Sequence, residues 1–284
     1  MVKVGTVWDS AVDAVRGRAG MIAPIAAVTV FLPSVIQAAM QSYALPPGVP
    51  PSAGVSVLGM LVSIGTLLLT LWGALAITAI TSHPDVTRAE AGRLATARLL
   101  PLLGLTVMLA LALTLLALPF FALLAGAGVE LARMATPGYQ PELSGGTAVA
   151  AFIYLLLLLG VLIWIFARLM PLLPVVLYER LGLRAVGRAF RLTRGIGAKL
   201  VGVLILFAIV LIVTTGAAQL VSGLAFRLVL GADNISTATF LAGVAGAVVA
   251  TILSVLSYAF VARLYVMLSG RDRAPRSEDA PAAA

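Results

Sequence analysis

Residues 200–225 read LVGVLILFAIVLIVTTGAAQLVSGLA and contain no charged side chain. A run of this length exceeds the roughly 20 residues with which an α-helix crosses the hydrocarbon core of a bilayer. A surface helix of a soluble protein keeps one polar face toward water, and this stretch has none. The stretch therefore predicts a helix that spans a membrane.

Five further runs are also predominantly apolar and about as long as a bilayer crossing requires. Spans are predicted at residues 21–40, 55–80, 99–126, 148–177, 200–225 and 240–268. In the whole chain of 284 residues, 61% are hydrophobic, 11% are charged and the mean hydropathy is +1.11. One soluble core cannot bury so much apolar surface. The predicted fold class is all-α and integral to the membrane, with one polytopic domain over residues 1–270 and a disordered cytoplasmic tail over residues 271–284.

The basic residues fall almost entirely on one side of this arrangement. Of the 19 lysines and arginines, all but Arg133 and Arg227 lie on the side of the N-terminus, in its loops, at adjoining span ends or in the tail. Cytoplasmic segments of membrane proteins carry such an excess of positive charge. We therefore expect both termini in the cytoplasm. The heavy use of alanine, leucine, valine and arginine suggests a bacterial protein, which places the spans in the inner membrane.

A weak repeat divides the spans into three hairpins, with approximate units 7–80, 84–177 and 179–268. Units two and three end their second spans alike, with FARL at 166–169 and VARL at 261–264. Each unit opens with a cytoplasmic segment that mixes arginine with apolar residues. We expect each opening segment to form an interfacial helix ahead of its hairpin.

The third opening segment has the clearest pattern. Its arginines at 184, 188 and 191 share one helical face, while Val186 and Phe190 lie opposite. Guanidinium groups bind phosphate, and each basic residue near an anionic leaflet contributes on the order of 1 kcal/mol. Topology and anchoring alone would also account for this charge. The candidate residues for contact with lipid headgroups are Arg168, Arg184, Arg188, Arg191, Arg194, Lys199 and Arg263.

The chain offers little for catalysis. It contains no cysteine, and its single histidine, His83, adjoins a proline in a loop. No pair of carboxylates falls inside a span, so neither a metal site nor an acid–base pair is predicted. We expect no enzyme activity, no catalytic residue and no cofactor. The net charge of +8 is attributed to topology and membrane lipids, so no nucleic-acid partner is expected. A homo-oligomer or a membrane partner protein stays open.

Uncharged polar residues in the last two spans support an alternative function. Thr214, Gln219 and Ser254 are candidates for a polar path between spans five and six, as in a small permease or channel component. The simpler role of these side chains is hydrogen bonding between helices.

Residues 171–182 read PLLPVVLYERLG, and residues 185–195 read AVGRAFRLTRG. Here the chain resembles the membrane domain that is attached to some bacterial glycerophosphoryl diester phosphodiesterases and that also occurs as a stand-alone protein. Catalysis in those enzymes belongs to a separate soluble domain, so the resemblance implies no activity here. It implies an inner-membrane module in lipid or envelope homeostasis. The leading expectation is therefore a non-enzymatic protein that contacts anionic lipid through arginine-rich cytoplasmic helices.

Overall fold

The computed structural model describes residues 4–44, 52–134, 141, 143–231 and 234–270. Every regular element in these ranges is helical. The helices are α1 (Val4–Ala26), η1 (Ala27–Phe31), α2 (Leu32–Ala39), η2 (Met40–Ala44), α3 (Ala53–Ser82), α4 (Arg88–Gly126), η3 (Leu131–Arg133), α5 (Gly145–Leu169), α6 (Leu172–Glu179), α7 (Arg184–Leu192), α8 (Gly197–Leu230) and α9 (Ile235–Ser269).

Six helical segments of the described residues are long and apolar enough to cross a membrane. They are Val4–Tyr43, Ala53–Ser82, Arg88–Gly126, Gly145–Glu179, Gly197–Leu230 and Ile235–Ser269. The number and order of these segments agree with the six predicted spans, which indicates a multi-pass α-helical membrane protein. The predicted tail at residues 271–284 lies outside the described residues.

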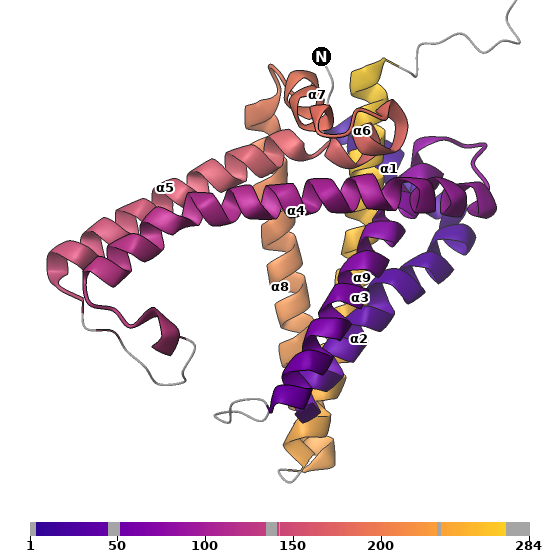
Figure 1. The fold of residues 1–284 in the computed structure, drawn as a ribbon. Coiled ribbons are helices and arrows are strands. Elements are labelled where there is room, and N and C mark those ends of the chain that lie inside the picture. Colours follow the sequence, from indigo (N-terminus) through magenta and orange to yellow (C-terminus); the bar gives the residue numbers. More distant parts are fainter. Residues whose placement is uncertain (1–3, 45–51, 135–140, 142, 232–233, 271–284) are drawn as a thin grey trace, which may run out of the picture.

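The start of α1, the turn between α3 and α4, the pair α6 and α7, and the end of α9 gather at one end of the bundle (Figure 1). We call this the basic end. The start of α3, the end of α8 and the start of α9 lie at the other end, which we call the opposite end. The hairpin of α4 and α5 leaves the basic end at a steep inclination to α3, α8 and α9.

The first opening segment and the first span form a continuous helical segment with a kink between them. This helix runs from Val4 to Tyr43 through the π-helical turns η1 and η2, and it departs from helical geometry at Arg18, where φ is −130° and ψ is 17°. The second opening segment is likewise the first part of α4. The third opening segment contains a helix of its own, α7, and the first is set off from its span by the kink at Arg18.

Arginine side chains satisfy backbone carbonyls around the bend in α1. Pro24 has no N–H to donate to the carbonyl of Gly20, and Arg88 donates to that oxygen from Nη2 at 2.8 Å. Arg18 Nη1 donates to three carbonyls at the end of α3 and in the turn after it, those of Ile80 (2.8 Å), His83 (2.9 Å) and Val86 (3.3 Å). The last carbonyls of a helix lack partners within the helix, so these arginines stabilise the turn.

The π-helical turn η1 packs tightly against α3. A Cβ added at Gly73 would lie 2.0 Å from Thr29 Oγ1, so only glycine fits at this contact. Pro33 leaves the carbonyl of Thr29 without its helical donor, and Thr70 donates to it from Oγ1 at 3.4 Å. A neighbouring helix thus replaces a hydrogen bond that lipid could not supply.

Burial changes abruptly along α3. Every residue from Gly73 to Ser82 is buried, whereas no residue from Ala53 to Trp72 is. The buried half belongs to the main hydrophobic core, where Leu75 and Ile77 pack with side chains of α1, α4, α6 and α9. The core of the protein therefore sits at the basic end.

The hairpin of α4 and α5 exposes apolar side chains along most of its length. Tyr154 of α5 donates from its hydroxyl to the carbonyl of Leu116 in α4 at 2.7 Å, and its ring stacks on Phe120 at 5.9 Å. Closer to the basic end, Leu111 is 60% exposed and Leu157 is 66% exposed. Such contiguous apolar surface requires lipid or another protein to cover it.

Candidate functional sites

Glu179 at the end of α6 joins three helices at the basic end. Arg188 of α7 donates from Nε to Glu179 Oε2 at 2.8 Å, and the hydroxyl of Tyr265 in α9 donates to Oε1 at 2.9 Å. The Glu179 side chain is 15% exposed and that of Arg188 is 36% exposed, so water screens the pair only partly. This arrangement fastens α6 and α7 to α9.

A tight turn between α6 and α7 brings the two charges together. Arg180 and Gly182 both have φ of +54°, a left-handed conformation that is uncommon for arginine. The turn reverses the chain so that Ala185 and Ala189 become buried. The glutamate, glycine and arginine of the sequence motif at 171–195 are therefore explained by packing within the protein.

Helices α5 and α7 cap each other. Arg168 donates from Nη1 to the carbonyl of Phe190 at 3.3 Å, while the hydroxyl of Thr193 lies 3.4 Å from the carbonyl of Arg168. The guanidinium of Arg168 also lies over the ring of Trp164, with its Cζ 5.2 Å from the ring centroid. The guanidinium of Arg168 therefore already contacts groups of the protein itself.

The seven candidate basic residues divide into two groups. Arg168 and Arg188 are engaged as described, and Arg263 is half-buried. The other four are exposed, and no acidic side chain in the described part of the chain forms an ion pair with them: Arg184, Arg191, Arg194 and Lys199. We call these four residues the basic surface.

The apolar side of α7 packs against protein. Ala185, Ala189 and Thr193 are buried, and the ring of Phe190 lies edge-on to Trp164 at 5.8 Å. This side of α7 faces α5 and α6. The charged side of α7 is the side left exposed.

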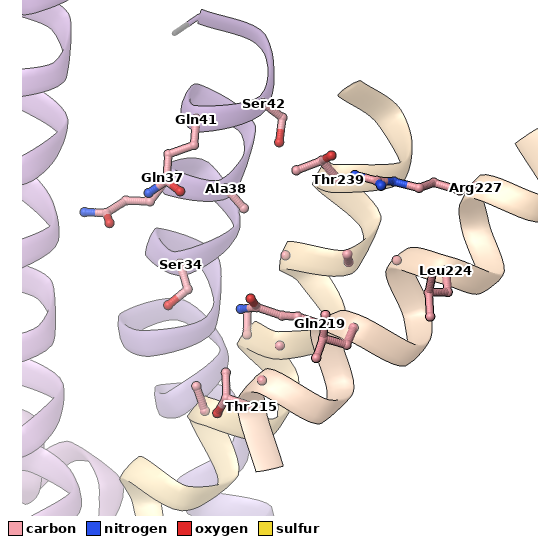
Figure 2. Close-up of a pocket in the computed structure, with 18 residues that line it drawn as sticks. Ser34, Gln37, Ala38, Gln41, Ser42, Thr215, Gln219, Leu224, Arg227 and Thr239 are labelled. Atoms are coloured by element: carbon pink, nitrogen blue, oxygen red, sulfur yellow. The ribbon is translucent and has the colours of Figure 1, made fainter. Parts of the chain in front are cut away.

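A cavity of about 580 Å³ lies toward the opposite end, between α2 with η2, α8 and α9. Figure 2 shows α2 on one side and α8 on the other, with α9 between them. Its polar lining residues are Ser34, Gln37, Gln41, Ser42, Thr215, Gln219, Arg227 and Thr239. In Figure 2, Gln219 extends from α8 across α9 toward α2, and Arg227 points toward Thr239.

Small residues of α9 make room for this cavity. A Cβ added at Gly246 would lie 2.5 Å from Gln219 Nε2, and one at Gly243 would lie 2.9 Å from the Cβ of Ala38. Glycines therefore let α8 and α2 approach α9 from two sides. The polar side chain of Gln219 occupies the space above Gly246.

Of the three residues predicted for a polar path, Gln219 lines the cavity. Thr214 and Ser254 are not among the lining residues. The hydroxyl of Thr214 donates to the carbonyl of Val210 at 2.6 Å, whereas the Oγ1 of the next residue, Thr215, is buried and has no hydrogen-bond partner in the structure. Thr215 and Arg227, which belong to the cavity, were missed because the rotation of each helix about its axis cannot be read from a uniformly apolar span.

No protein family, curated protein or solved structure matches the chain. Within the described residues, no group of three or more acidic, histidine or cysteine side chains could hold a metal ion. His83 lies with its ring edge-on to Tyr178 at 5.4 Å. The basic surface and the cavity are therefore the features from which a function can be argued.

Proposed function

We propose that this chain is a non-enzymatic protein of a bacterial inner membrane that binds anionic lipid at its basic end, on the cytoplasmic side, in lipid or envelope homeostasis. The observation that carries the proposal is the exposure of Arg184, Arg191, Arg194 and Lys199. They follow one another within sixteen residues of chain, at the entrance to the long apolar helix α8. This position suits contact with headgroups at the boundary of a bilayer.

The distribution of the paired arginines supports the same proposal. Arg18, Arg88 and Arg168 donate to backbone carbonyls, and Arg188 pairs with Glu179. These contacts give those four arginines an internal role. Exposed cations without an acidic partner keep their hydrogen-bonding capacity for an external anion, and lipid phosphate is the anion at that depth.

The test compares two double variants of the full chain in nanodiscs that mix phosphatidylglycerol with phosphatidylcholine. Arg184→Gln with Arg191→Gln removes two charges from the basic surface. At about 1 kcal/mol per charge, we expect retention of phosphatidylglycerol to weaken by up to roughly thirtyfold. Native mass spectrometry of the protein with its retained lipids measures the change.

The matched control is Arg16→Gln with Arg93→Gln, which removes two exposed arginines from α1 and α4 at the same end. We expect a clearly smaller loss of phosphatidylglycerol, because these two charges do not belong to the basic surface. Equal losses in the two double variants would show that lipid retention depends only on the net charge of the protein, and would refute the role of the basic surface. Unchanged lipid retention in the first variant would refute the proposal.

A further inference from the structure

We infer that the cavity between α2, α8 and α9 binds the phosphate-bearing headgroup of an anionic phospholipid, which enters sideways from the bilayer. This inference does not rest on the basic surface, which lies at the other end of the bundle. It rests on the charge of the cavity lining, on its depth, and on apolar residues that border it.

The charge of the lining favours an anion. Among the described residues that line the cavity, Arg227 is the one that carries a charge, and it is exposed. The remaining polar groups are amides and hydroxyls, which can donate to or accept from a neutral polar group. A phosphate beside Arg227 would form charge-assisted hydrogen bonds, and headgroup hydroxyls would pair with the amides. A quaternary ammonium would find no acidic partner among the described lining residues.

The depth of the cavity places polar groups where lipid tails would otherwise be. Thr215 and Arg227 both line it and are twelve residues apart on α8, which corresponds to about 18 Å at the helical rise of 1.5 Å per residue. Arg227 stands three residues before the end of α8, at Leu230. With Arg227 at the headgroup level, the polar lining passes the midpoint of a hydrocarbon core about 30 Å thick.

An apolar border lies beside the polar lining. Leu220 is 69% exposed and Leu224 is 63% exposed, and both line the cavity. On a membrane-spanning helix these side chains face acyl chains. A ligand that satisfies both surfaces carries a polar head and an apolar tail, so a phospholipid fits better than a fully water-soluble solute.

The inner part of the cavity holds polar groups that the protein does not pair. Gln219 is exposed toward the cavity, and the buried hydroxyl of Thr215 lacks a partner. Polar groups at membrane depth are usually satisfied, because lipid tails offer no hydrogen bonds. Headgroup hydroxyls and the water that accompanies them would supply these bonds.

The absence of cysteine allows a reporter to be placed at the cavity without background. We choose Thr239→Cys, because Thr239 is exposed, lines the cavity and lies beside Arg227 in Figure 2. The full chain is placed in nanodiscs of phosphatidylcholine, with or without phosphatidylglycerol. The rate of reaction with a water-soluble maleimide is then measured. We expect phosphatidylglycerol to slow labelling about fivefold or more, because its headgroup covers the reporter.

Two substitutions test the role of the charge in this background. Arg227→Gln should abolish the protection. Arg133→Gln should leave it intact, because it removes the same charge from the other arginine on that side of the predicted topology, which pairs with Glu130 and does not line the cavity. A second reporter, Ser236→Cys, is exposed on α9 outside the cavity and corrects for effects of bilayer charge on the reagent.

Glycerol 3-phosphate, added to discs of phosphatidylcholine alone, distinguishes the source of the phosphate. No protection by this soluble ester, together with protection by phosphatidylglycerol, supports a lipid ligand. Protection by the ester that depends on Arg227 would support the same phosphate chemistry with a ligand from water. Equal labelling rates under all conditions, or equal loss of protection in Arg227→Gln and Arg133→Gln, would overturn the inference.

Discussion

At the basic end, helices pack around the main hydrophobic core and several arginines donate to backbone carbonyls, whereas at the opposite end α2, α8 and α9 surround a polar cavity. The single helix α3 shows the contrast, because it is fully buried from Gly73 to Ser82 and nowhere buried before Gly73. Two halves of a helix that are both apolar in sequence thus differ in how much of their surface other helices bury. Lipid covers apolar surface at either end, so close packing and internal hydrogen bonds decide where this fold is rigid.

The largest effect is expected at the closest helix contact. Gly73→Ala places a methyl group against Thr29, where a Cβ would lie 2.0 Å from Oγ1 and 2.5 Å from Cβ. The new methyl group and the Thr29 side chain can both be accommodated only if α3 moves away from η1. We therefore expect a loss of about 3 kcal/mol in the free energy of unfolding. Titration with denaturing detergent, followed by circular dichroism, measures the loss.

Gly65→Ala on the same helix is the matched control. A Cβ at Gly65 meets nothing within 4 Å, so the substitution should change stability by less than about 1 kcal/mol. Similar destabilisation by both substitutions would show that the two halves of α3 are equally packed, and the contrast between the ends would fail.

An intermediate effect is expected from the two glutamates that form ion pairs. Glu179→Ala removes both the partner of Arg188 and an acceptor of the Tyr265 hydroxyl, and we expect a loss of about 2 kcal/mol. Glu130→Ala disrupts an exposed pair with Arg133, whose side chains are 61% and 64% exposed, and should cost less than about 1 kcal/mol.

Thermal unfolding of both glutamate variants in the same detergent provides the comparison. If Glu130→Ala lowers the melting temperature as much as Glu179→Ala does, the network around Glu179 does not fasten α6 and α7 to α9.

The smallest effect is expected from the Thr70 hydroxyl, which donates to the carbonyl that Pro33 leaves without a donor. Thr70→Val removes the donor to the carbonyl of Thr29, a long contact of 3.4 Å, and we expect a loss of about 0.6 kcal/mol. Thr66→Val, one turn away on α3, should be neutral. Repeated detergent titrations can resolve this difference, and a neutral Thr70→Val would mean that the bent helix needs no donor from α3.

The spans could be predicted from the sequence because their signal is length and apolar content. The predicted span 200–225 lies within α8, and 55–80 lies within α3. The helices that contain the predicted spans 21–40 and 99–126 begin earlier, at Val4 and Arg88, where basic residues lower the hydropathy without breaking the helix. Backbone hydrogen bonding continues through charged residues, so hydropathy marks the membrane and not the helix end.

The candidate sites could be predicted only in part from the sequence. The face shared by Arg184, Arg188 and Arg191 follows from helical spacing, but spacing could not reveal that Glu179 engages Arg188. The cavity is assembled from three helices that are far apart along the chain, so it depends on packing that a single sequence does not contain. Thr214 and Thr215 differ by one position, which turns a side chain by about 100° around the helix. Only the packed structure decides which of them faces the cavity.

The contact between the first and last helices bears on biosynthesis. Val7 and Ala11 pack with Phe260 and Leu264, about 250 residues later in the chain. At about 5 to 20 residues per second, a ribosome needs on the order of ten to fifty seconds to produce that interval. During that time the first turns of the nascent protein lack their final neighbour, and a chaperone, the insertion machinery or lipid must shield them. Truncation before residue 260 would leave this exposed state permanent, and quality-control proteases would have a lasting target.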